Sequence, residues 1–260
     1  MIIDTHCHLD DPRYKEDLDA VMKRALENGV SGVLIPGADS NDLERAREIA
    51  YTYKNVYFAA GVHPYHHEGY DEVLLKEYLK DPKCIAVGEC GLDYYRLPTD
   101  DNEKEKEIHV QKDIFRKQIR LAREVCKPLI VHIREANDDS RRLLLEEKAG
   151  EVGGVLHCYN ASKHLLDLAE HGFYFGIGGV LTFKNAKALV EVLPLIPRTK
   201  LLIETDGPYL TPMPHRGERN EPSYTVLVAE KMAEILDIPI TKVHEITSKN
   251  AFSLFKAFEK

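Results

Sequence analysis

The chain has 260 residues, of which 43% are hydrophobic and 30% are charged, a length that fits one large domain or two small ones. No apolar run reaches the roughly 18 residues of a membrane-spanning helix, and no basic segment followed by an apolar one opens the chain, so we expect neither a membrane protein nor a secreted one. The formal net charge of −8 argues against a protein that coats nucleic acid through bulk electrostatics, but it does not exclude a nucleic-acid enzyme.

Short apolar runs alternate along the chain with stretches of helical periodicity. The predicted strands are Ile2–Thr5, Gly32–Ile35, Val56–Ala60, Ile85–Gly88, Leu129–His132, Val155–His157, Phe173–Ile177 and Leu201–Glu204. The predicted helices are Asp17–Glu27, Asp42–Tyr51, Glu72–Leu79, Glu107–Val125, Asp138–Glu147, Lys163–Glu170, Ala186–Leu193, Tyr224–Leu236 and a last amphipathic segment, Ile240–Phe258.

Strands that alternate with helices indicate parallel pairing through right-handed crossovers. Eight such units favour an α/β protein with one domain over residues 1–260, a (β/α)8 TIM barrel with a C-terminal extra helix. The alternative is a doubly wound open sheet, which usually has fewer units and often a GxGxxG turn, and no such turn follows the first strand. Two longer connections, Arg96–Glu105 and Pro208–Pro222, follow strands and are therefore expected at the catalytic rim of the barrel.

Two histidines end the first predicted strand, in "MIIDTHCHLD". Side chains alternate between the two faces of a strand, so His6 and His8 point the same way and Cys7 points oppositely. At the carboxyl end of a barrel strand this direction can lead into the barrel mouth, where two imidazoles suit a divalent metal. The alternative for an isolated HxH is a pair of hydrogen-bonded polar residues. Cys7 is interpreted as a packing residue, and the five cysteines, which form no CxxC pair, indicate reduced thiols in a cytoplasmic protein.

Further metal-competent side chains follow later strands. Alone, each could cap a strand or line the rim, but together they give four histidines and two carboxylates at one face of the barrel. Glu89 has the two oxygens needed to bridge two ions. The other ligands would be His6, His8 and Asp206 for the first ion, and His132 and His157 for the second. Two ions about 3.5–4 Å apart can activate a water and hold a phosphodiester in line.

The segments "DTHCHLD", "GVHPY", "GECGLDYY", "VHIRE", "LHCY", "LIETDGPYL" and "HRGERNEP" resemble the TatD-like metal-dependent hydrolase family. The resemblance runs in order from residue 2 to about residue 250. It implies an amidohydrolase-type TIM barrel, a deoxyribonuclease activity usually described as 3′ exonucleolytic, and the same six ligands: His6, His8, Glu89, His132, His157 and Asp206. The chain departs from the family after the sixth strand, where the family often has HCF followed by Ser or Thr and Gly, and this chain has "HCYNA".

We therefore expect a divalent-metal-dependent hydrolase, a DNase that uses a dinuclear site and a metal-activated water. Asp206 is the predicted base that orients and deprotonates the water, and Glu89 is the second catalytic residue. The alternative is a metal-dependent esterase, lactonase or amidohydrolase, including an enzyme that hydrolyses the ester of aminoacyl-tRNA. A metal-stabilised scaffold is disfavoured, because structural zinc sites are usually closed and single.

The cofactor is expected to be two divalent cations per chain. Ligation by nitrogen and oxygen without a thiolate admits Mg, Mn, Zn, Co or Ni. The expected partner is single-stranded DNA or a DNA end, with no membrane, and a monomer is plausible. The candidate substrate contacts are His63, Tyr94, Arg134 and Arg216, and Asp93 is interpreted as a hydrogen-bonding residue at the rim.

Overall fold

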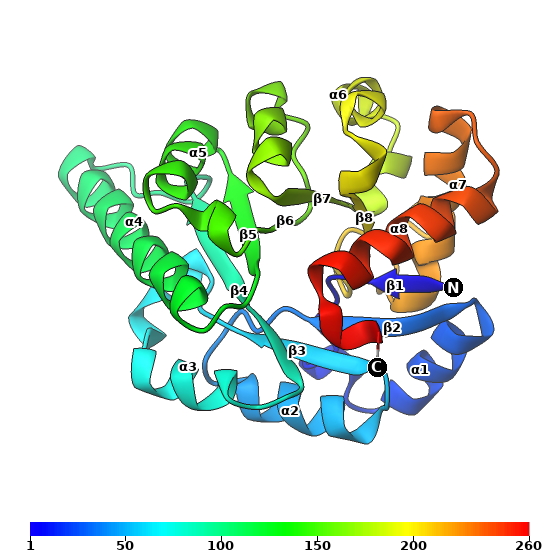
Figure 1. Ribbon diagram of the computed structural model, residues 1–260, viewed down its shortest axis with the longest axis horizontal. Coiled ribbons are helices and arrows are strands. Elements are labelled where there is room, and N and C mark those ends of the chain that lie inside the picture. The colour runs from blue at the N-terminus through cyan, green and yellow to red at the C-terminus, as the bar shows by residue number, and fades with distance from the viewer. Residues whose placement is uncertain (260) are drawn as a thin grey trace.

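The computed structural model describes residues 1–259, and their strands form one parallel sheet with β1 to β8 in chain order (Figure 1). The strands are β1 (Ile2–Asp4), β2 (Val30–Ile35), β3 (Val56–Ala60), β4 (Cys84–Asp93), β5 (Leu129–Arg134), β6 (Gly154–Leu156), β7 (Phe173–Ile177) and β8 (Leu201–Ile203). The α-helices are α1 (Leu18–Glu27), α2 (Leu43–Thr52), α3 (Glu72–Leu79), α4 (Asp101–Glu124), α5 (Asn137–Glu146), α6 (Lys187–Val192), α7 (Thr225–Leu236) and α8 (Ile240–Leu254). None of these helices is long and apolar enough to cross a membrane.

Backbone hydrogen bonds close the sheet between its first and last strands. Thr5 donates its N–H to the carbonyl of Ile203 at 3.1 Å, and Asp206 donates its N–H to the carbonyl of His6 at 2.8 Å. The sequential strand order and this closure confirm the predicted TIM barrel. The doubly wound alternative is wrong, because its strand order would reverse at a switch point.

Apolar side chains fill the molecule in two clusters. The larger cluster lies between the strands and the surrounding helices. The smaller one draws on seven strands and α8, so it lies inside the barrel, and it includes Ile3, Leu34, Ala59, Ile130, Val155 and Leu202. The C-terminal segment, red in Figure 1, covers one end of the barrel by placing Phe255 and Ala251 in this cluster. The opposite, carboxyl end of the strands is thereby left for a site.

We expect Phe255→Ala to lower the free energy of unfolding by about 3–5 kcal/mol, because a fully buried aromatic side chain would be replaced by a cavity. Phe255 is 1% exposed and contacts residues that line the inside of the barrel. Urea denaturation of the two proteins measures the difference. The neighbouring Lys256→Ala, at an exposed position, is the control and should change the stability by less than about 0.5 kcal/mol.

Several element boundaries differ from the sequence-based expectation. The connection expected over Arg96–Glu105 is shorter, because α4 begins at Asp101, where the Asp100 carboxylate accepts the N–H groups of Asn102 and Glu103. Such a cap satisfies free donors of the first turn and lets a charged segment start a helix. The stretch Lys163–Glu170 lies within a 3-10 helix, Lys163–His171, and α8 ends at Leu254, four residues before the expected end.

Candidate metal centre

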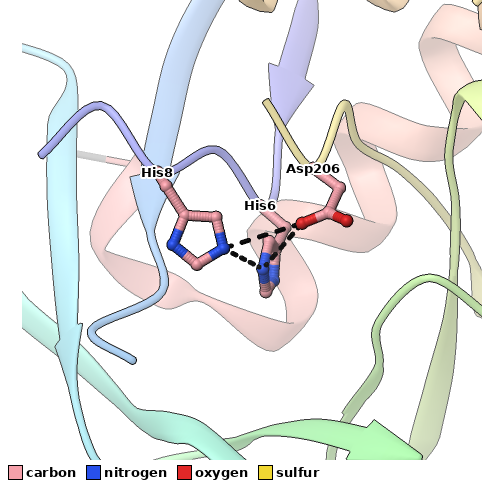
Figure 2. A group of neighbouring side chains, drawn as sticks. All are labelled: His6, His8 and Asp206. Atoms are coloured by element: carbon pink, nitrogen blue, oxygen red, sulfur yellow. Dashed lines mark hydrogen bonds and ion pairs between the residues drawn. The ribbon is translucent and has the colours of Figure 1, made fainter. Parts of the chain in front are cut away.

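Six side chains converge at the carboxyl end of the barrel, and they are the six that the sequence singled out. Glu89 and His132 lie within β4 and β5, which extend further than expected, whereas the other four lie one to four positions after the end of a strand. Asp206 has a φ of 57°, a left-handed conformation that aspartate tolerates better than most residues. Figure 2 shows the ring nitrogens of His6 and His8 directed at a carboxylate oxygen of Asp206.

The first group of donor atoms has the dimensions of a metal site. His6 Nε2 lies 3.3 Å from His8 Nε2, 3.4 Å from Glu89 Oε2 and 3.5 Å from Asp206 Oδ1. His8 Nε2 lies 3.7 Å from the same glutamate oxygen and 3.6 Å from the same aspartate oxygen. Four ligands about 2.1 Å from a tetrahedral ion would be about 3.4 Å apart. The residues therefore fit a divalent cation.

The second group uses the other oxygen of Glu89. Glu89 Oε1 lies 3.0 Å from His132 Nδ1 and 2.9 Å from His157 Nε2, and these two nitrogens are 3.1 Å apart. Two imidazoles and a carboxylate are donors that Zn²⁺ and related ions accept. Glu89 thus presents one oxygen to each group and lies between them.

Electrostatics keep the two carboxylates of the centre ionised. Burial alone would raise the pKa of Glu89, but the charges of His157 and His6 and the hydrogen bonds of His132 and His157 hold it well below its usual range. Burial likewise opposes ionisation of Asp206, yet the hydrogen bond to His8 and the nearby histidine charges lower its pKa. Both side chains are therefore available as anionic ligands at neutral pH.

Asp93 holds one of the histidines from behind. Its Oδ2 lies 2.9 Å from His132 Nε2, so the opposite nitrogen, Nδ1, is the one that faces Glu89. Its side chain is only 1% exposed, so it lies beneath the rim rather than on it. A carboxylate in this position fixes the tautomer and the ring orientation of a ligating histidine.

Two buried acids that the sequence interpretation did not single out support the centre. Asp4 accepts hydrogen bonds from the N–H of His6 (3.2 Å) and from the N–H and hydroxyl of Thr205 (3.0 and 2.6 Å), which joins the ends of β1 and β8. Glu204 accepts the N–H of Cys158 at 2.5 Å, and the same Oε1 lies 3.7 Å from His157 Nδ1. An acidic residue inside an apolar run, as in "LLIETD", is the sequence signal that could have identified Glu204.

Two buried glutamines of α4 fix the loops beside the centre. Gln118 accepts the N–H of Val62 at 2.8 Å and donates to its carbonyl at 2.9 Å, directly before His63. Gln111 accepts the N–H of Asp93 at 3.0 Å. Their signal in the sequence is an amide on the apolar face of a helix, which is unusual because burying an unpaired amide is unfavourable.

The candidate substrate contacts do not all reach the centre. His63 does: its Nε2 lies 3.7 Å from Glu89 Oε1. Its Nδ1 accepts the N–H of Tyr65, and burial lowers its pKa to about 3, so the neutral ring carries its proton on Nε2, facing the centre. Arg134 lines the cavity above the centre, and its guanidinium lies 3.6 Å from the centroid of the Tyr95 ring.

The structure places Tyr94 and Arg216 away from the candidate metal centre. Tyr94 is turned away from the cavity above the centre, because its hydroxyl donates to Asp139 at 2.8 Å and its ring contacts the core. The exposed neighbour Tyr95 carries the ring beneath Arg134. Arg216 lies over the ring of Phe183 at 3.7 Å and lines neither of the cavities that adjoin the centre. Cys7 is buried in the larger apolar cluster, as expected.

We expect Glu204→Gln to lower the affinity for divalent metal by about 10- to 100-fold, because a second carboxylate behind a ligating histidine sets its orientation and basicity. His157 Nδ1 and Glu204 Oε2 are both buried without a hydrogen-bond partner among the described residues. The nearby Glu204 carboxylate, at 3.7 Å, is therefore the group that can orient the His157 ring. Competition with a fluorescent chelator measures the affinity. The matched control is Glu170→Gln, at an exposed position, and an unchanged affinity in Glu204→Gln would contradict the positioning role.

Barrel and centre together define a class of protein, the metal-dependent hydrolases built on a (β/α)8 barrel. The chain belongs to the TatD related DNase family, whose model matches residues 3–256. The resemblance inferred from the motifs is thereby confirmed.

Relatives and solved structures agree with this family over most of their length. The uncharacterized metal-dependent hydrolase YabD of Bacillus subtilis is 41% identical over 262 residues, which cover 98% of this chain and 99% of the relative. The 3′-5′ ssDNA/RNA exonuclease TatD of Enterobacter lignolyticus is 34% identical over 241 residues, covering 89% and 90%. The crystal structure of YjjV, a TatD homologue from Escherichia coli, superimposes with a TM-score of 0.87 at 29% identity and covers 98% of each chain.

Proposed function

We propose that this protein is a divalent-metal-dependent deoxyribonuclease that removes nucleotides from the 3′ end of single-stranded DNA. The observation that carries the proposal is the position of Glu89, whose two oxygens face two separate groups of donor atoms. Two divalent cations held there would polarise a phosphoryl group and lower the pKa of a water. The name of the Enterobacter relative, an exonuclease of single-stranded DNA and RNA, supports this choice of bond.

The ligands in this proposal are His6, His8 and Asp206 on one side of Glu89, and His132 and His157 on the other. Asp206 turns Oδ1 toward the histidines, and Oδ2 is then the atom that accepts the proton of the attacking water. His63, with its proton on Nε2, donates to a phosphoryl oxygen. Arg134 is exposed and binds the neighbouring phosphate.

The experiment that tests the proposal compares two classes of bond with one metal-loaded preparation. One arm is a short single-stranded DNA with a free or a blocked 3′ end. The other is a panel of carboxylic esters, lactones and amides that includes an aminoacyl-tRNA. Release of mononucleotides from the free 3′ end alone supports the proposal. Turnover of the ester panel without cleavage of DNA would overturn it in favour of the esterase alternative.

We expect DNA binding to depend only weakly on salt, because the protein carries a net charge of −8 and few cations line the site. Two to four phosphate contacts predict a slope of about −1.4 to −2.8 in a plot of log K against log salt, at roughly −0.7 per phosphate of a single strand. Fluorescence anisotropy with a labelled oligonucleotide measures the slope. A value near −7, typical of a protein that coats nucleic acid, would contradict this mode of binding.

A further inference from the structure

The mouth of the barrel holds two cavities that meet at the metal centre. The first, about 400 Å³, lies among the loops that follow β1 to β4, and the second, about 570 Å³, lies among those that follow β5 to β8. Both are lined by His132, His157 and Asp206 of the centre and by Arg134 and Tyr209. A molecule that reacts at the centre can therefore extend into either cavity.

The two cavities differ in charge. Four carboxylates, Asp10, Asp11, Asp39 and Asp42, and one further cation, Arg96, line the first cavity in addition to the residues of the centre and Arg134. Apart from the residues that both cavities share, the described lining of the second contains no charged side chain. Like charges repel across a low-dielectric cleft. The excess of carboxylates over cations makes the first cavity a poor site for a phosphate group, whereas the second can accept an uncharged group.

The second cavity combines an apolar lining with one free amide. Its lining includes the buried Ile133, Ala186 and Leu189. Asn160 also lines it, but its side chain already has partners: Nδ2 donates to Asn137 Oδ1 at 2.8 Å, and Oδ1 accepts the N–H of Ser162 at 3.1 Å. Asn185 is exposed in the cavity and makes no side-chain hydrogen bond to another described residue. It can offer both a donor and an acceptor to the edge of a planar ligand.

One positively charged side chain, that of Arg134, lines both cavities where they join. Arg134 extends from β5 two residues beyond His132 and contacts no described carboxylate within ion-pair distance; its guanidinium is supported by the Tyr95 ring. A phosphate at the centre would lie within the same cleft as the arginine, and an uncharged group attached to that phosphate would find its apolar surroundings in the second cavity. A phosphate joined through a sugar to an uncharged, planar, hydrogen-bonding ring is a nucleotide.

We propose that the second cavity is a subsite for one unpaired nucleobase, which lies against Leu189 and Ala186 and is hydrogen-bonded by Asn185. The proposal deepens the proposed function and rests on it for the phosphate at the centre. A base in this cavity is unpaired, because the apolar lining and Asn185 take the place of its stacking and pairing partners. The excess of carboxylates in the first cavity disfavours a second phosphate there, so the DNA chain is expected to leave the centre along the side of Arg134.

The test measures binding directly, so it does not depend on whether DNA is cleaved. Isothermal titration of the Mg²⁺-loaded protein compares 2′-deoxyadenosine 5′-monophosphate with 2-deoxyribose 5-phosphate, which lacks the base. Base stacking of the usual strength predicts that the nucleotide binds about 5- to 150-fold more tightly. Equal affinities for the two compounds would overturn the proposal.

Two variants test whether the preference for the nucleotide over the sugar phosphate arises in the second cavity. Ala188→Phe places a ring in the second cavity from an exposed position of α6 and should abolish the preference for the nucleotide while leaving the sugar phosphate unaffected. Asn185→Ala should weaken only the nucleotide, by about 3- to 10-fold. Glu191→Phe, exposed on the same helix and outside both cavities, is the matched control and should keep the wild-type preference. A preference that survives Ala188→Phe would place the base elsewhere and overturn the assignment.

Cleavage of DNA separates this proposal from the proposed function. If the protein prefers the nucleotide but cleaves no DNA, the base subsite stands and the deoxyribonuclease activity fails. If it cleaves DNA but binds both compounds equally, the activity stands and the subsite fails.

Discussion

Replacement of Glu89 by alanine should abolish hydrolysis and reduce the bound divalent metal from about two ions per chain toward one or none. Glu89 is 3% exposed, and its two oxygens lie 3.4 Å from His6 Nε2 and 2.9 Å from His157 Nε2. Without this carboxylate the two groups of histidines would lose their common anion, because the other carboxylate of β4, Asp93, lies on the opposite side of the His132 ring. Metal analysis and single-turnover cleavage on the same samples measure both effects.

Two further variants show whether the effect comes from the charge of Glu89 itself. Glu89→Gln keeps the volume of the side chain and isolates the loss of charge, and it should also lose metal and activity. Glu68→Ala removes an exposed carboxylate at the rim and should change neither quantity. A Glu89→Ala protein that keeps both ions and a near wild-type rate would exclude the bridging role.

The fold could be predicted because its signals are local. Each strand is an apolar run bounded by polar residues, and Val56–Ala60 and Phe173–Ile177 have the predicted bounds. Other strand ends depend on long-range pairing. β4 continues to Asp93 because its later residues pair with β5, where Gly91 lies opposite His132 and Asp93 opposite Arg134. Periodicity alone does not report such a partner.

The convergence of the six candidate ligands could be predicted for a topological reason. The carboxyl ends of all parallel strands of a barrel lie at the same face, so a polar residue that follows any strand is brought near the others. This reasoning places Glu89 and Asp206 together although 117 positions separate them in the sequence, the difference between 206 and 89.

The supporting residues were harder to predict, because their roles depend on side-chain direction. Glu204 lies only two positions before Asp206 in the sequence. Its carboxylate nevertheless lies near Nδ1 of His157, whereas Nε2 of the same ring faces Glu89. It has room there because residue 176 is glycine: a Cβ at that position would lie 2.1 Å from Glu204 Oε2. Tyr94 and Tyr95 also differ in side-chain direction. The hydrogen bond to Asp139 shows that the Tyr94 ring points away from the cleft, and the sequence alone does not distinguish it from Tyr95.

Replacement of Asp206 by asparagine should lower the hydrolytic rate by roughly 10²–10⁴-fold at saturating metal, the usual contribution of a positioned acid–base group. Asp206 Oδ1 lies 3.5 Å from His6 Nε2 and 3.6 Å from His8 Nε2, which is the position of a ligand. Asparagine keeps one coordinating oxygen at this position but cannot accept the proton of the attacking water. Metal binding should therefore weaken only in part, while the rate falls steeply.

Two aspartates serve as controls for Asp206, and they separate a base from a positioning residue. Asp93→Asn alters the residue behind His132, so it should act mainly through metal affinity, by about 10- to 100-fold, and excess metal should restore most of the rate. Asp42→Asn alters an exposed acid at the edge of the cleft and should have little effect on the chemical step. Single-turnover cleavage of a short single-stranded DNA over a range of metal concentrations distinguishes the three. If Asp206→Asn cleaves at a near wild-type rate with both ions bound, the base lies elsewhere.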